Sequence, residues 1–179
     1  MERKIITMLK PVQIQATQET MKAYIGIDPG SSGAIVSISE GGEVRTLRFG
    51  KSTQKDIWDF FNSVSFDYEC FATLELVGAM PGQGVSSMFT FGKNVGFIIG
   101  LLTASAIPYQ EKVPRSWQKE LGITPRFKPK KGESGTEETK PQFKKRLKEK
   151  AEKLFPKESV LTDTADALLL AEYTRRTYK

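Results

Sequence analysis

Four acidic residues stand at positions where carboxylates could work together. Asp28 ends an apolar run and precedes a Pro-Gly turn, and Glu75 lies inside a second apolar run, residues 70–77. Asp163 and Asp166 are spaced i, i+3, so on a helix they would share one face. A carboxylate in a buried strand is costly unless it is paired, protonated or bound to a cation. We therefore expect the four side chains to converge on one cation-binding site.

The chemistry of such a site follows from its ligands. Carboxylate oxygens are hard donors that suit Mg²⁺ or Mn²⁺, which also bind the phosphate oxygens of a substrate. Two such ions, about 3.5–4 Å apart, can activate water on one side of a phosphodiester and stabilise the leaving oxygen on the other. Taken singly, Asp28 could be a turn former, Asp163 a charge at a helix start and Asp166 a solvated residue. Taken together with Glu75, they favour a metal-dependent nuclease.

The composition excludes several other chemistries. The 179 residues contain no histidine and one cysteine, Cys70. This rules out Ser/His/Asp and Cys/His nucleophiles, zinc sites that use histidine and an internal disulfide. Catalysis must then use carboxylates, lysine or metal. The net charge is +6 and the pI is about 9.3, which favours a polyanionic partner.

The positive charge is concentrated in one segment. Residues 112–157 contain 15 basic and 6 acidic residues, a net charge of +9, which leaves −3 for the rest of the chain. Such asymmetry is typical of a surface that binds a phosphate backbone, while a solvated helix face with a surface loop is the alternative. The candidate DNA-binding residues are Lys112, Arg115, Lys119, Arg126, Lys128, Lys130, Lys131, Lys140, Lys145 and Lys148.

The hydrophobic pattern predicts a mixed sheet flanked by helices. Residues 23–28, 34–39 and 44–49 are typical of strands joined by tight turns and should form an antiparallel meander. Thr53 and Asp56 form a capping-box pattern ahead of apolar residues at helical spacing. The other predicted elements are strands at 70–77 and 107–113 and helices at 88–105, 115–121, 141–155 and from Thr162 onward. This order predicts an α/β fold.

Two segments between these elements are expected to be loops. Residues 78–87 are rich in Gly and Pro, and residues 122–139 form a basic loop with few apolar side chains. The basic loop is either a substrate clamp or a surface insertion. The helix at 88–105 carries small residues at four-residue spacing, which indicates tight helix packing.

The length favours one domain, at residues 21–179, preceded by an N-terminal extension at 1–20. The extension lacks the apolar core and the cleavage site of a signal peptide. The longest apolar run, residues 97–107, is too short to span a bilayer. We therefore expect an intracellular, soluble protein that does not contact membranes.

The acidic residues occur in an ordered set of motifs: YIGIDPG at residues 24–30, Leu74-Glu75, and DTADAL at residues 163–168. With this set, nearly all of residues 21–178 resembles the RuvC-like Holliday junction resolvases of the RNase H superfamily. The stretches GAMPGQGVSSMFTFGKNVGFIIGLL and VPRSWQKELGI are more similar to the phage and plant-organelle branches of that family. This branch would place the protein in an organelle or in the cytoplasm of a phage-infected host.

The resemblance implies an RNase H-like fold with a mixed five-stranded sheet. It also implies a homodimer that resolves four-way DNA junctions by paired symmetric nicks, with two Mg²⁺ (or Mn²⁺) ions per active site. By motif, Asp28, Glu75, Asp163 and Asp166 correspond to the metal-binding catalytic residues. Lys144 corresponds to a catalytic lysine near the scissile phosphate, with Lys145 and Lys140 as alternatives.

One position departs from the bacterial members of that family. They carry an aromatic wedge three residues beyond the glutamate, and here that position is Gly78. Met80, Met88 and Phe89 are the candidates that could splay the junction instead. Two alternative functions share the same fold: a nuclease for other branched DNA or RNA/DNA hybrids, and a junction-binding module without catalysis. Replacement of an acid would favour the module, but all four acids are present.

Overall fold

The computed structural model describes residues 21–78, 84–129 and 134–178. A mixed five-stranded sheet with the order β3-β2-β1-β4-β5 forms its centre. The strands are β1 (Lys22–Ile27), β2 (Ala34–Ser39), β3 (Val44–Arg48), β4 (Glu69–Glu75) and β5 (Tyr109–Lys112). The first three strands are antiparallel, as predicted, while β4 is parallel to β1 and β5 is parallel to β4. The predicted extension at 1–20 lies outside the described residues.

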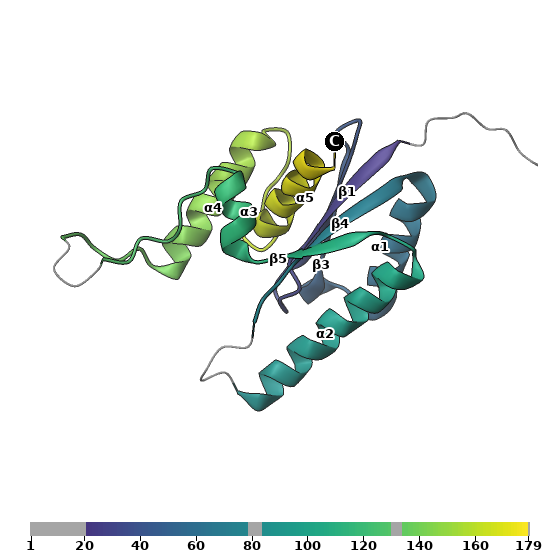
Figure 1. Ribbon diagram of the computed structural model, residues 1–179, viewed down its shortest axis with the longest axis horizontal. Helices are drawn as coiled ribbons and strands as arrows, with labels where there is room; N and C mark the ends of the chain where they lie inside the picture. The colour runs from purple at the N-terminus through teal and green to yellow at the C-terminus, as the bar shows by residue number, and fades with distance from the viewer. Residues whose placement is uncertain (1–20, 79–83, 130–133, 179) are drawn as a thin grey trace, which may run out of the picture.

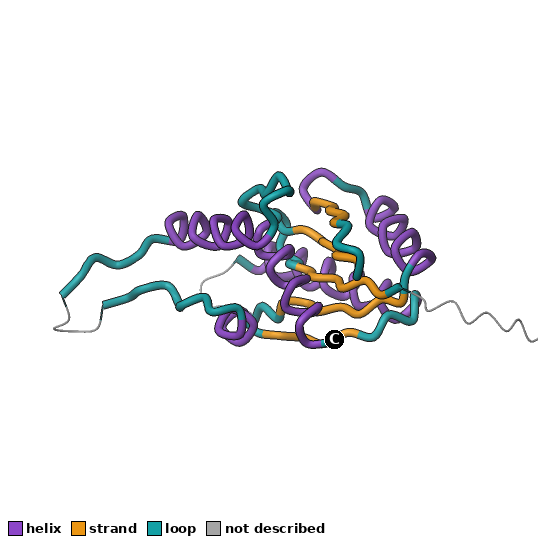
Figure 2. The backbone as a smooth tube through the Cα atoms, turned by 90° about the horizontal axis from the view of Figure 1, so that it is seen from above, coloured by secondary structure: helices purple, strands orange, loops and turns teal. Residues whose placement is uncertain are grey.

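Helices cover both faces of the sheet, which confirms the predicted α/β architecture (Figures 1 and 2). One face packs against α1 (Gln54–Asp67) and α2 (Val85–Ala104), and the other against α3 (Pro114–Glu120), α4 (Lys140–Leu154) and α5 (Ala165–Thr177). The predicted capping box of Thr53 and Asp56 opens α1. Each face of the sheet has its own hydrophobic core. In β2, Val36 and Ile38 pack in the core on the side of α5, while Ile35 packs in the core on the side of α1 and α2. This alternation arises because successive strand residues point to opposite faces.

Helix α5 lies directly on β1, and Gly26 makes this approach possible. A Cβ atom at Gly26 would come within 2.2 Å of the Ala167 carbonyl oxygen and of the Ala171 amide nitrogen. The buried hydroxyl of Thr174 adds a hydrogen bond to the Ile25 carbonyl at 3.2 Å. The start of α5 is thereby fixed against the end of β1, where the acidic residues lie.

The start of α5 differs from the sequence prediction. Helical geometry begins at Ala165 rather than at Thr162, so Asp163 lies in the turn before the helix and does not share a helical face with Asp166. The reason is a tight turn, in which the amides of Thr164 and Ala165 both donate to the Leu161 carbonyl, at 3.2 and 3.0 Å. The prediction that a common helix aligns the two aspartates is therefore wrong.

Two further boundaries affect the site. Strand β4 ends at Glu75, so this carboxylate sits at the tip of the strand rather than inside it. Helix α2 begins at Val85, three residues before the predicted start at Met88, and ends at Ala104. By length and composition alone, α2 would suffice to cross a membrane, which is weak evidence because core helices of soluble proteins meet the same criterion. The expected lack of membrane contact stays a prediction.

Candidate active site

Three acidic side chains meet at one edge of the sheet. Strands β1 and β4 are parallel neighbours, with Ile27 aligned to Leu74, so their carboxyl ends lie together. Asp28 follows the first of these residues and Glu75 the second. Asp166 reaches the same edge from the first turn of α5. The three acids thus lie at the same edge of the sheet, and their sharing of one cation site stays a prediction.

Among the three acids at this edge, Glu75 has the pKa that is shifted furthest from its ordinary value. Its side chain is buried, and Oε1 accepts a hydrogen bond of 3.1 Å from the indole Nε1 of Trp117. Burial, followed by the nearby charges of Asp28 and Asp166, raises the pKa of Glu75 to about 8. Without a cation, this carboxyl group is therefore largely protonated at neutral pH.

Trp117 is a site residue that the sequence analysis missed. It lies in α3 and is fully buried, and its only polar atom points at Glu75. Buried tryptophans normally donate their N–H to an acceptor, so the unusual partner here is a carboxylate. The signal in the sequence was a lone tryptophan within the stretch VPRSWQKELGI, which by itself does not name the acceptor.

Lys144 lies beside the acidic group and contacts one of its members. Its Nζ donates to Oδ2 of Asp166. Burial lowers the pKa of Lys144, but the attraction of Asp166, Asp28 and Glu75 outweighs it, so the pKa lies above its usual range. The alternatives lie elsewhere: Lys145 pairs with Glu149 at 3.9 Å, and Lys140 is exposed at the start of α4.

Asp166 has one carboxylate oxygen without a partner. Oδ1 is buried and accepts no hydrogen bond from any described residue. Burial raises the pKa of Asp166, and the ion pair with Lys144 only partly offsets this effect. A buried acceptor left unsatisfied is costly, and a divalent cation is one group that would satisfy it.

Asp163 does not join the other three acids. Its Oδ2 accepts a hydrogen bond of 2.7 Å from Nε of Arg48, and Nη2 of the same arginine contacts the same oxygen. Arg48, Asp163, Asp28 and Lys144 line a common pocket of about 490 Å³. Asp163 thus lies at the rim of the site, apart from Asp28, Glu75 and Asp166, so the predicted convergence of all four carboxylates is not seen.

The donor set fits a hard divalent cation. Within residues 21–78, 84–129 and 134–178, no three acidic side chains lie close enough together to hold a metal ion as they stand. Two of the four carboxylates instead contact the cationic groups of Lys144 and Arg48. The unpartnered oxygen of Asp166 and the purely oxygen-based donors still match Mg²⁺ or Mn²⁺ better than a softer metal.

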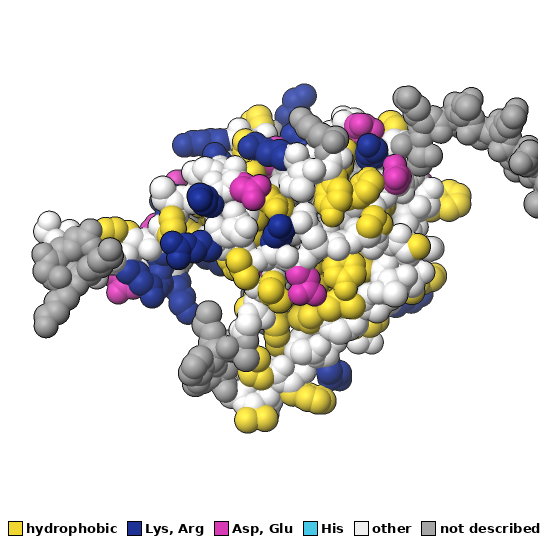
Figure 3. Space-filling view, viewed as in Figure 1, with side chains coloured by type: hydrophobic (Ala, Val, Ile, Leu, Met, Phe, Trp, Pro, Cys, Tyr) yellow, Lys and Arg dark blue, Asp and Glu magenta, His cyan; other side chains and the backbone are white. Residues whose placement is uncertain are grey.

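The candidate DNA-binding residues spread over β5, α3, α4 and the basic loop. Lys112 is the strand partner of Glu75, and Arg115 and Lys119 are exposed on α3, where both line a pocket of about 460 Å³. In Figure 3, Lys and Arg side chains gather over α3, α4 and the loop. Of the other candidates, Arg126, Lys145 and Lys148 pair with glutamates, Lys128 and Lys140 are exposed, and Lys130 and Lys131 lie outside the described residues.

The described part of the basic loop is anchored to α4. Arg146 donates from Nη1 to the Thr124 carbonyl at 3.1 Å and from Nη2 to Glu138 at 2.9 Å. The two legs of the loop, 122–129 and 134–139, are joined by a backbone hydrogen bond of 3.0 Å from Glu138 to Phe127. Figure 2 shows these legs extending away from the sheet. Either predicted role, clamp or surface insertion, is compatible with this arrangement.

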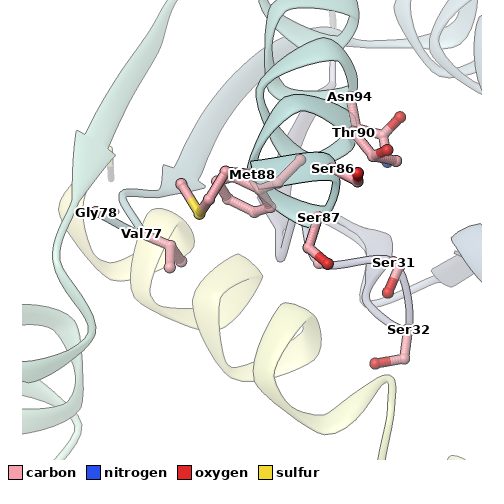
Figure 4. A pocket seen from close by; sticks show the side chains of 11 residues that line it. Ser31, Ser32, Val77, Gly78, Ser86, Ser87, Met88, Thr90 and Asn94 are labelled. Atoms are coloured by element: carbon pink, nitrogen blue, oxygen red, sulfur yellow. The ribbon is translucent and has the colours of Figure 1, made fainter. Parts of the chain in front are cut away.

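The wedge candidates lie in three different environments. Met88 lines a cavity of about 520 Å³ between α2, the turn at Gly30–Ser32 and the segment after Glu75 (Figure 4). Phe89 is 69% exposed on the outer face of α2. Met80 lies outside the described residues. Of the described candidates, Met88 is thus the one that shares a cavity with the segments that follow Asp28 and Glu75.

The fold was compared with known proteins. No protein-family model matches the chain, and no curated protein is detectably similar in sequence. Among solved structures, it is similar to RuvC of T. thermophilus in complex with a Holliday junction substrate, with a TM-score of 0.50 and 15% identity over 87% of this chain and 96% of that one. A second structure, Thermus thermophilus RuvC, matches with a TM-score of 0.48 and 16% identity. The chain therefore has a RuvC-like fold.

Proposed function

We propose that this protein is a metal-dependent endonuclease that resolves four-way DNA junctions by paired symmetric nicks. The observation that carries this proposal is the meeting of Asp28, Glu75 and Asp166 around Lys144 at the carboxyl edge of the sheet. The RuvC-like fold supports it, since the similar structure is described as a RuvC in complex with a Holliday junction substrate. Asp163 completes the ligand set if it leaves Arg48.

The bound cations, Mg²⁺ or Mn²⁺ at two per site, would activate water and stabilise the leaving oxygen of the phosphodiester. Asp28, Glu75, Asp163 and Asp166 would hold them. Trp117 keeps one oxygen of Glu75 in a fixed direction through its hydrogen bond of 3.1 Å. Lys144 contributes a positive charge beside the phosphate that is cut, where charge develops during hydrolysis.

The basic residues support a nucleic-acid substrate. Those on α3 and α4 share one side of the molecule with the basic loop (Figure 3). Their charges would bind phosphates without reading sequence, which suits a substrate recognised by shape. At the junction centre, Met88 would then take the place of the missing aromatic wedge, in line with the expected phage or organelle branch.

A homodimer is supported by the surface of α2. The helix contains 20 residues, of which only Ile98, Leu101 and Leu102 are buried. Phe89 and Val85 are exposed apolar side chains on it. A second copy that covers this helix would bury the apolar surface and bring two acidic sites into one particle, as paired nicks require.

The test is cleavage of a synthetic four-way junction by the purified protein in Mg²⁺, compared with Asp28→Asn and Glu75→Gln. We expect both variants to lose about 10²–10³-fold in rate, as when a charge-stabilising group is removed from an active site. Asp59→Asn changes a half-buried aspartate on α1 that pairs with Lys55, on the other side of the sheet from α5, and this control should cleave like the wild type. Symmetric nicks that persist in the two variants would contradict the proposal.

A further inference from the structure

The ion pair of Arg48 and Asp163 separates one carboxylate from the other three. Arg48 is the last residue of β3, and two of its nitrogens contact the same oxygen of Asp163. Both side chains are accessible, at 38% and 26% exposure. Because they line the pocket that also contains Asp28 and Lys144, the guanidinium group lies on the solvent side of the acidic site.

The backbone around Arg48 is held on both sides. In the sheet Arg48 is aligned with Ala34, and the neighbouring Phe49 amide donates to the Gly33 carbonyl at 3.0 Å. The hydroxyl of Ser52 donates to the Arg48 carbonyl at 2.8 Å. Only the flexible side chain is left to move, so the guanidinium can change partners without any shift of the strand.

We propose that Arg48 is a positioning residue with two alternating partners. In the cation-free site it holds Asp163 outside the acidic group, and once Asp163 binds a cation, Arg48 contacts a phosphate of the bound DNA strand. This inference rests on the proposed function. Two nitrogens of Arg48 occupy Oδ2 of Asp163, so this oxygen has no lone pair left for a cation, and the ion pair holds the side chain away from the other three acids. Arginine keeps its charge, and its forked donors match phosphate as well as carboxylate.

The chain offers a matched control on the same strand. Arg45 is also an ion-paired arginine of β3, with contacts of 2.8 Å to Glu43 and to Asp67. These partners lie in the β2–β3 turn and at the end of α1 rather than in the acidic pocket. Arg45→Ala therefore removes the same type of side chain and ion pair from the same strand without touching the site.

The first test is a calorimetric titration of the DNA-free protein with Mn²⁺. If Arg48 competes with the cation for Asp163, Arg48→Ala should bind Mn²⁺ more tightly, by up to about fivefold for a partly exposed pair. Arg48→Lys should lie between, and Arg45→Ala should equal the wild type. Mn²⁺ binding to Arg48→Ala that is no tighter than to the wild type would overturn the proposal.

The second test measures junction affinity against salt concentration, once in EDTA and once in Ca²⁺, with the DNA checked for intactness. Each phosphate contact contributes roughly 0.9 to the slope of log K against log[salt]. Arg48→Ala should lower this slope by about one in Ca²⁺ and leave it unchanged in EDTA. An equal decrease of the slope in EDTA and in Ca²⁺, or no decrease in Ca²⁺, would contradict the proposed change of partner by Arg48.

The two tests separate this inference from the proposed function. The Mn²⁺ titration needs no DNA, so its outcome does not depend on the substrate. If an RNA/DNA hybrid is cleaved and the junction is not, the proposed function fails, and the salt slopes measured on the hybrid still decide the role of Arg48.

Discussion

Helices α5 and α2 both carry several apolar side chains, yet α5 buries them and α2 leaves most of them exposed. In α5, ten consecutive residues from Ala165 to Thr174 are buried, and the helix is pressed onto β1 at Gly26. In α2, only 3 of 20 residues are buried, and its glycines face open space. The difference shows that α5 is packed to position Asp166 at the acidic site, while α2 keeps an exposed apolar surface, which in our proposal a second copy covers.

The largest expected loss of stability arises where α5 approaches β1 at Gly26. Gly26→Ala would place a methyl group 2.2 Å from backbone atoms of α5, so we expect a loss of about 4 kcal/mol or more in the free energy of unfolding. Gly96→Ala is the control on α2, where a Cβ atom would meet nothing within 4 Å, and should stabilise the helix by up to about 1 kcal/mol. Urea denaturation measures both. Similar changes in the free energy of unfolding at the two glycines would contradict the difference in packing between α5 and α2.

The next largest effect is a pH dependence of stability that arises from Glu75 at the acidic edge of the sheet. Because its pKa is raised to about 8 in the folded protein, the folded state holds a proton that the unfolded state has released. This stabilisation is complete below the ordinary glutamate pKa and is lost as the pH rises through about 8. In EDTA, we expect the free energy of unfolding to fall by on the order of 2 kcal/mol between pH 6 and pH 9.

The measurement is denaturation at several pH values, with Glu75→Gln to remove the effect and Glu111→Gln, an exposed glutamate on β5, as the control. Mg²⁺ should reduce the pH dependence of the wild type, since the cation favours the charged form. A Glu75→Gln variant with the same pH dependence as the wild type would show that Glu75 does not hold this proton.

A smaller effect is expected for the lysine inside the site. Lys144→Ala leaves the buried carboxylate of Asp166 without its cationic partner, which should cost about 1–2 kcal/mol in EDTA, less than for a fully buried pair because Lys144 is 45% exposed. Lys145→Ala, which breaks only a surface pair, should cost less than about 0.5 kcal/mol. Thermal denaturation in EDTA compares them, and equal losses would place both lysines on the surface.

The smallest effect on folding is expected on α2. Phe89→Ser replaces a side chain that is 69% exposed, so the free energy of unfolding should change by less than about 0.5 kcal/mol. The dimer should nevertheless weaken by about tenfold or more, as measured by sedimentation velocity. Lys93→Ala, a change of an exposed polar residue on the same helix, is the control. A dimer that is unaffected by Phe89→Ser would exclude this position from the interface.

The sequence allowed the order of elements and much of the acidic site to be predicted. Local patterns sufficed for the strand end at Asp28 but placed Glu75 inside a strand rather than at its tip, and the resemblance pointed to Lys144. Their functional roles stay predictions. The pairing of Arg48 with Asp163, 115 residues away, could not be predicted, because it depends on the sheet register and on the turn before α5. The contact of Trp117 with Glu75 depends in the same way on how α3 packs.

The proposed function is defined by the nucleic acid that the protein cuts. The decisive measurement compares initial cleavage rates, in Mg²⁺, for a synthetic four-way junction, a linear duplex of the same sequence and an RNA/DNA hybrid. We predict paired symmetric nicks in the junction and much slower cleavage of the other two substrates. Cleavage of the duplex or the hybrid without cleavage of the junction would contradict the account.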